Sequence, residues 1–296
     1  MHQSASVQRL RQKLEALNSI CKDITAVKQS RAFEFMDLDQ FRCLLQSNVS
    51  RAAQVYWTEI LYRSHVASIT ALARHSCWIE ACLKLSDGNP SFLGFAACLR
   101  GLLESSADTF FSLRAVPLTI ASNYRLIGDA TRGVFSGNGF VAEDLENLLI
   151  HFLYARKLEQ DEMDPGNHRA EPISQYVKCL VDKEDASVKK LYAQLCQIAH
   201  PAAQSVHWMI RGLPDSLQFC QQPDDQPLHR LLEKNVEAVE TVADIPVNIS
   251  ICTLKVLNRF CVTEVRTEPA DRYTPPGWTK VEAAIDSSYR TSYPVN

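Results

Sequence analysis

Residues 92–111, FLGFAACLRGLLESSADTFF, form the most informative stretch of this 296-residue sequence. Successive residues of an α-helix are about 100° apart, so the apolar side chains of this stretch can be assigned to faces. One face is apolar and consists of Phe92, Ala96, Leu99 and Leu103. Another carries only small side chains, which let a neighbouring helix approach closely: Gly94, Gly101, Ser105 and Ser112. The stretch therefore predicts a helix packed on several sides.

Arg100 and Glu104 are the two charged residues on a third strip of this helix, between Leu93 and Phe111. Because that strip is otherwise apolar, we expect both side chains to be largely buried. An unpaired buried charge costs several kcal/mol, so the two must be paired, and their i,i+4 spacing permits a salt bridge. Two interpretations stay open: a structural ion pair that fixes the helix register, or an anion-recognising Arg100 that Glu104 orients.

Amphipathic helical patterns of the same kind cover most of the remaining chain. Glycine is scarce, with 10 residues in 296, and few stretches alternate with period two. The sequence therefore predicts an all-α fold, a single helical bundle domain of about eight to nine helices. One short β-hairpin is expected near residues 205–220. The predicted organisation is N-terminal helices over 1–48, a bundle core over 49–261, and an extended or poorly ordered tail over 262–296.

Composition and charge limit the compartment and the partners. The formal net charge is -3, which argues against a nucleic-acid footprint over the whole chain and leaves only a local patch. The ten cysteines are scattered, without a Cys-x-x-Cys pair, as expected for reduced thiols in a cytoplasmic protein. No secretory signal or membrane-spanning run is visible, so we predict no contact with a membrane.

Three further residues are candidates for a site. His200 precedes Pro201 at the expected end of a helix, so its imidazole can point away from the packed face. The alternative is a capping histidine at a helix stop. Tyr192 lies two turns earlier on the same helix and is a candidate ligand contact. His65 lies on the apolar stripe of a long helix, where a histidine either binds a ligand or is a hydrogen-bonded core residue.

Standard catalytic and cofactor motifs are missing from the sequence. It contains no Walker loop, no GxGxxG after a strand, no GxSxG and no HExxH. The acidic segment 159–168 has metal-type ligands but does not follow the EF-hand spacing, so we interpret it as a solvated loop. We therefore predict no cofactor and no metal, and the sequence leaves open whether the protein is an enzyme.

Two segments together resemble a known group. The Arg-Gly-Leu-Leu-Glu-Ser helix at Arg100 and Glu104, and the later LYAQLCQIAHP segment with Tyr192 and His200, resemble uncharacterised bacterial helical proteins loosely similar to HEPN-type domains. This resemblance implies a helical fold and, for some members, ribonuclease or nucleotide-transfer activity in bacterial defence. HEPN nucleases carry an Arg-x4-6-His pattern on one helix, and none of the eight histidines here follows an Arg at that spacing.

Two functions are consistent with these observations. The first is a helical binding or interaction module for a small anionic ligand or a protein partner, in a bacterial defence or stress system. The alternative is a HEPN-like ribonuclease or phosphate-processing enzyme that uses Arg100, Glu104 and His200. The partner is not defined by the sequence, and a second copy of the chain is one candidate. If a functional centre exists, we expect it where the 91–114 helix meets the end of the 186–199 helix.

Overall fold

The protein is all-α. The computed structural model describes residues 4–26, 32–134, 141–164, 166–181, 186–200, 205–206, 209–213, 216–219 and 225–290. Within these residues the chain divides into two compact units, each built from segments that are far apart in the sequence. The predicted boundaries at 48/49 and 261/262 do not coincide with this division, because long helices belong partly to one unit and partly to the other.

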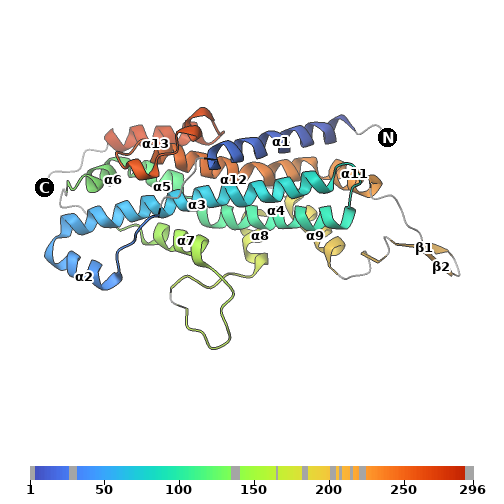
Figure 1. Ribbon diagram of the computed structural model, residues 1–296, viewed down its shortest axis with the longest axis horizontal. Coiled ribbons are helices and arrows are strands. Elements are labelled where there is room, and N and C mark those ends of the chain that lie inside the picture. Colours follow the sequence, from blue (N-terminus) through green and yellow to red (C-terminus); the bar gives the residue numbers. More distant parts are fainter. Residues whose placement is uncertain are drawn as a thin grey trace. The chain divides into compact units, whose positions relative to one another are not determined.

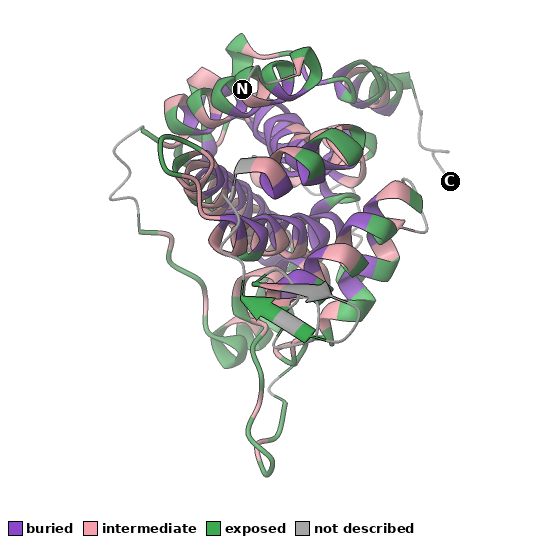
Figure 2. Cartoon of the chain, turned by 90° about the vertical axis from the view of Figure 1, so that its right-hand side faces the viewer, coloured by how far each residue is buried: buried purple, intermediate pink, exposed green. Residues whose placement is uncertain are grey.

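Unit 1 contains residues 1–22, 73–111 and 171–246. Its elements, labelled in Figure 1, are most of α1 (Ala5–Thr25), the C-terminal part of α3 (Val49–Leu85), most of α4 (Phe92–Leu113), α8 (Ile173–Val181), α9 (Ala186–Ala199), β1 (Ile210–Leu213), β2 (Ser216–Phe219), α11 (Asp225–Lys234) and the N-terminal half of α12 (Val236–Leu257). On the helices, buried residues gather along one side and exposed residues along another, as Figure 2 shows in purple and green. This is the amphipathic pattern that the sequence predicts.

Helices α3 and α4 pack closely in unit 1. A side-chain carbon placed on Gly101 would lie 2.6 Å from the ring of Trp78, which is closer than carbon atoms approach. The glycine therefore makes room for the indole ring, in agreement with the small-residue face predicted for α4. Deeper in the unit, His75 Nε2 lies 2.8 Å from the carbonyl oxygen of Ala243, which ties α3 to α12.

Unit 2 contains residues 23–72, 112–170 and 247–296. Besides its shares of α3 and α12 it holds α2 (Leu38–Ser47), α5 (Val116–Ser122), α6 (Tyr124–Thr131), α7 (Glu143–Tyr154), the 3-10 helices η1 (Thr263–Val265) and η2 (Glu268–Arg272), and α13 (Trp278–Arg290). Residues 250–257 of α12 are all buried, as in a helix that is covered on every side. Asp37 caps α2, because its carboxylate accepts from the backbone N–H of Asp39 and Gln40.

The expected tail from residue 262 is wrong as far as Arg290. The segment folds into η1, η2 and α13, and its apolar side chains are buried: Val265, Ala270, Trp278, Val281 and Ile285. Helix α13 packs on α5. Pro269 lies in the first turn of η2, where a missing N–H costs little, and Pro275 and Pro276 shortly precede α13. Residues 291–296 lie outside the described residues.

Asparagines divide two helical stretches. Asn235 separates α11 from α12, and its side-chain amide donates to the carbonyl of Leu231. Asn123 likewise separates α5 from α6. These breaks give the described residues more helices than the eight or nine expected. Strands β1 and β2 pair antiparallel, with Ile210 opposite Phe219. The turn of the expected hairpin, and other parts of 205–220, lie outside the described residues.

Candidate functional site

The strip of α4 that carries Arg100 and Glu104 is its least buried face. Their side chains are 22% and 26% exposed, so both are mostly covered, as predicted, but not as completely as a core ion pair. The neighbours that suggested burial, Leu93 and Phe111, are themselves only partly buried. The helical spacing placed Arg100 and Glu104 on the same strip of α4. The apolar residues at the two ends of that strip do not determine which other elements pack over it.

Four of the predicted site residues come together in unit 1, and we call them the Arg100 cluster: Arg100, Glu104, Tyr192 and His200. Arg100 Nε donates to Glu104 Oε1 at 2.7 Å, and Arg100 Nη1 lies 3.1 Å from His200 Nε2. The Tyr192 hydroxyl donates to Glu104 Oε1 over a longer 3.4 Å, and its ring centroid lies 6.0 Å from Arg100 Cζ. The end of α9 thus meets the middle of α4.

The contact between Arg100 and His200 defines the state of the imidazole. A guanidinium has only donors, so His200 Nε2 accepts, and this requires that Nε2 carry no proton. His200 is exposed and follows the last turn of α9, where its backbone N–H donates to the carbonyl of Cys196 at 3.0 Å. Pro201 lies outside the described residues. An imidazole protonated on both nitrogens has no acceptor, so that form could not keep the bond from Arg100.

The surroundings shift the pKa values of Tyr192 and Arg100. Burial, together with Cys196 and Glu104, raises the pKa of Tyr192 to about 12, so its hydroxyl stays a donor near neutral pH. Burial alone would lower the pKa of Arg100, but the bond and the charge of Glu104, with Cys196 and Tyr192, together raise it, so the guanidinium stays charged. Cys196 bonds the Tyr192 side chain and was missed from the sequence. Its i,i+4 spacing from both Tyr192 and His200 is the signal that could have found it.

A second ion pair on α4 has different surroundings. Arg74 Nη2 lies 2.7 Å from Asp108 Oδ2, 3.2 Å from the hydroxyl of Thr109 and 3.4 Å from the carbonyl of Ser105. This pair joins Arg74 of α3 to Asp108 of α4, whereas Arg100 and Glu104 pair within α4. Arg74 also contacts a hydroxyl and a carbonyl.

His65 lies in unit 2, outside the Arg100 cluster. It is 1% exposed, its Nε2 lies 2.9 Å from the hydroxyl of Thr267, and its ring packs edge-on against Phe33. These are the surroundings of a hydrogen-bonded core histidine. The interpretation of His65 as a ligand contact beside Arg100 has no support in these contacts.

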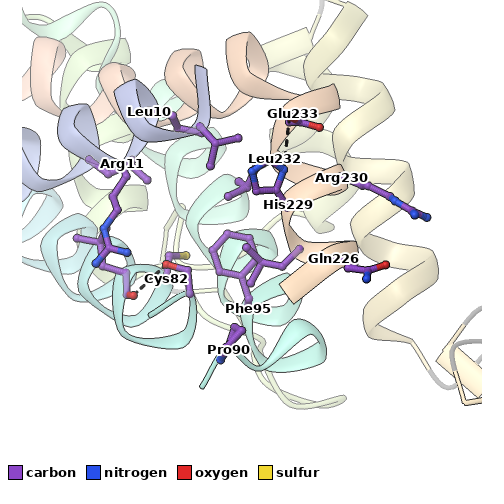
Figure 3. Close-up of a pocket in the computed structure, with 15 residues that line it drawn as sticks. Leu10, Arg11, Cys82, Pro90, Phe95, Gln226, His229, Arg230, Leu232 and Glu233 are labelled. Atoms are coloured by element: carbon purple, nitrogen blue, oxygen red, sulfur yellow. Dashed lines mark hydrogen bonds and ion pairs between the residues drawn. The ribbon is translucent and has the colours of Figure 1, made fainter. Parts of the chain in front are cut away.

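A pocket of about 490 Å³ opens in unit 1 between α1, the end of α3, the start of α4, and α11 (Figure 3). Its volume lies within the usual range of small-molecule sites, about 300–1,000 Å³. The apolar residues that line it are Val7, Leu10, Leu14, Cys82, Leu83, Pro90, Phe95, Leu228 and Leu232. The sequence did not indicate this pocket, because four helix ends from distant segments form it.

Polar groups at this pocket are already oriented. His229 Nε2 accepts the backbone N–H of Ser4 at 3.1 Å, so in the neutral ring the proton is on Nδ1, which faces Glu233 Oε1 at 3.4 Å (Figure 3). Across the pocket, Arg11 pairs with Asp87 at 3.0 Å and with Glu15 at 3.1 Å.

The described residues contain no group of three or more histidine, cysteine and acidic side chains placed to hold a metal ion. In the acidic loop, Asp164 accepts instead from the backbone N–H of Gly166 and His168, while Arg156 pairs with Glu162. Along the part of the chain that the structure describes, no helix has the length and apolar character needed to span a membrane.

Comparison with known proteins gives no relative for this chain. No family model matches it, and no curated protein or solved structure does. The function must therefore be argued from the geometry of the residues.

Proposed function

We propose that this chain is a helical binding module that holds a small anionic group at the Arg100 cluster. The observation that carries the proposal is the contact between Arg100 Nη1 and His200 Nε2. It places a permanent cation beside an exposed imidazole that can become a second donor.

A bound anion can replace one of the two hydrogen-bond partners of Arg100 more easily than the other. Its Nε donates to the charged carboxylate of Glu104, a strong charge-assisted bond that keeps the guanidinium in place. Its Nη1 donates to a neutral imidazole, so in this bond only the donor is charged, whereas both partners are charged in the bond to Glu104. An anionic oxygen therefore displaces His200 more readily than it displaces Glu104.

Protonation of His200 completes the site. The freed imidazole gains a proton more easily beside a bound anion, because opposite charge favours its charged form. Arg100 and His200 then both donate, which suits a phosphate or carboxylate group. Tyr192 lies beside this position, where its hydroxyl donates to Glu104.

Calorimetric titration with inorganic phosphate and diphosphate, at pH 6 and pH 8, tests this function. We expect tighter binding at pH 6, and a loss of about tenfold in affinity in both Arg100→Gln and His200→Gln, because each removes one charge-assisted donor. Arg74→Gln is the matched control, since it removes the other arginine that pairs with a carboxylate of α4. Equal affinities for Arg100→Gln and Arg74→Gln would contradict the proposal.

An enzymatic function of the same cluster is the second candidate. HEPN-type nucleases place their Arg and His on one helix; here Arg100 of α4 and His200 at the end of α9 meet from two segments. An imidazole beside a guanidinium, with Glu104 and Tyr192 in reach, has the groups needed for acid–base chemistry on a phosphate ester. Release of labelled fragments from single-stranded RNA, lost in His200→Gln, would favour the enzyme over the binding module.

We also propose a cytoplasmic location and a role in a bacterial defence or stress system, following the resemblance to HEPN-type proteins. None of the nine cysteines of the described residues forms a disulfide, which supports a reducing compartment. Light scattering of the purified chain, alone and with added phosphate, tests whether a second copy is the partner.

A further inference from the structure

We infer that the pocket between α1, α3, α4 and α11 is a second binding site, which takes a small amphiphile with an apolar body and one carboxylate. It is separate from the Arg100 cluster, because none of the four cluster residues lines it. Medium-chain fatty acids have the required chemistry.

The floor of the pocket suits an apolar chain. Leu10, Phe95 and Leu232 are buried in it, and Leu83 lies half-buried at its side. Figure 3 shows Leu10, Phe95 and Leu232 converging on the pocket from three helices, α1, α4 and α11. A hydrocarbon body placed here leaves water and gains about 0.8 kcal/mol for each buried methylene.

The charges at the pocket favour an anionic head. Among the residues that line it, Arg11 and Arg230 are cationic and Glu233 alone is acidic. Glu233 already faces His229 Nδ1. Among the lining residues, cationic side chains therefore outnumber acidic ones by one, and the two carboxylates that pair with Arg11, Asp87 and Glu15, lie outside the lining.

A ligand carboxylate can replace Asp87 as an ion-pair partner of Arg11. The side chain of Asp87 is 65% exposed, and ion pairs of such exposed residues contribute little to stability. A ligand carboxylate that approaches Arg11 from the pocket can replace Asp87 in the pair, while Glu15 continues to accept from Arg11 Nε. The ligand head then has the charge-assisted bond, and its chain lies on the apolar floor.

Titration calorimetry with sodium decanoate, and with decanol as the uncharged analogue, tests this site. Decanoate should bind about tenfold more tightly than decanol, because only decanoate pairs with Arg11. Arg11→Gln should remove that difference. Asp87→Asn should strengthen decanoate binding, because it removes the competing carboxylate, and a gain of affinity cannot come from misfolding.

Two further variants complete the experiment. Arg9→Gln is the matched control on α1, since Arg9 does not line the pocket and its exposed side chain pairs with Glu240 at 3.9 Å. It should bind decanoate like the unmodified protein. Leu83→Trp should fill the pocket and abolish binding of both decanoate and decanol. Equal binding of the two compounds, equal effects of Arg11→Gln and Arg9→Gln, or full binding by folded Leu83→Trp would each overturn the inference.

Discussion

Arg100 Nη1 lies 3.1 Å from His200 Nε2, although a hundred residues separate the two in the sequence. The contact joins the partly exposed strip of α4 to the end of α9. Arg100 also bonds Glu104, so one guanidinium has both a fixed charged partner and an exchangeable neutral one. Because a ligand can replace the neutral partner, the cluster is a candidate anion site and not only a structural ion pair.

Replacement of Glu104 by Ala should destabilise the protein by about 1–2 kcal/mol, because it leaves a half-buried guanidinium without its carboxylate. A fully buried pair would cost about 3–5 kcal/mol, and the observed exposure of 26% lowers that expectation. Urea titration followed by circular dichroism measures the difference. Glu15→Ala is the control, since the carboxylate of Glu15 is 51% exposed and its loss should cost less than about 0.5 kcal/mol.

His75 should make the protein sensitive to mild acid. Burial lowers the pKa of His75 from 6.5 to about 4, and its Nδ1 has no hydrogen-bond partner among the described residues. Between these values the unfolded chain binds a proton that the folded chain does not. Stability is therefore full above pH 6.5 and falls as the pH drops towards 4, by about 3 kcal/mol in total.

Urea midpoints at pH 7.5, 6.5, 5.5 and 4.5 test this effect. In His75→Gln, which keeps a donor for the Ala243 carbonyl, the midpoint should change much less over this range. Carboxylates affect stability at lower pH than His75 does. Bonds from Lys22 and Lys84 lower the pKa of Glu80 from 4.5 to about 2. The stability that Glu80 contributes is therefore lost as the pH falls below about 4.5. If the urea midpoint falls equally with decreasing pH in His75→Gln and in the unmodified protein, groups other than His75 cause the acid sensitivity.

Much of the helical organisation follows from local sequence, and the positions of α4 and α9 agree closely with the helices predicted over 91–114 and 186–199. Their apolar residues recur with helical spacing, and α9 ends at Ala199, just before the His200-Pro201 pair. The meeting of Arg100, Glu104, Tyr192 and His200 was also expected, because polar residues on an apolar helix need partners and His200 lies at a helix end.

Features that depend on distant segments could not be predicted in the same way. Whether Arg100 is covered depends on what packs over α4, and spacing within α4 does not specify this. Helix α13 lies in the segment that was expected to be a tail, whereas its Trp278 and Ile285 are buried in unit 2. The pocket lined by α1, α3, α4 and α11 arises from four separate segments, so no single motif marks it.

The cysteines should all be free, and their reactivity should follow burial. Thiol titration of the denatured, unreduced protein should return ten thiols per chain. In the native protein, burial raises the pKa of Cys21 to about 12 and that of Cys252 to about 11, and it also raises that of Cys82. We expect iodoacetamide at pH 8 to modify these three last, because the thiolate is the reactive form.

Mass spectrometry of peptides at successive times measures the order of modification. The exposed thiols provide the reference rate: Cys43, Cys77 and Cys261. Early labelling of Cys21 or Cys82, or a peptide pair joined by a disulfide, would contradict the expectation.

Truncation of Trp278 tests whether the C-terminal segment is part of the core. The side chain is 6% exposed, and its ring lies 4.8 Å from the ammonium group of Lys255, which is itself buried and donates to the carbonyl of Asp271. Trp278→Ala should therefore destabilise the protein by about 3–5 kcal/mol, since it removes a large buried ring and uncovers a cation that the ring stabilises. Tyr289→Ala on the same helix is the matched control, because that ring is 57% exposed and should contribute less than about 1 kcal/mol. Urea unfolding of both variants, followed by far-ultraviolet circular dichroism, compares their stabilities. If the two variants lose similar stability, α13 does not contribute to the core of unit 2 as its buried residues require.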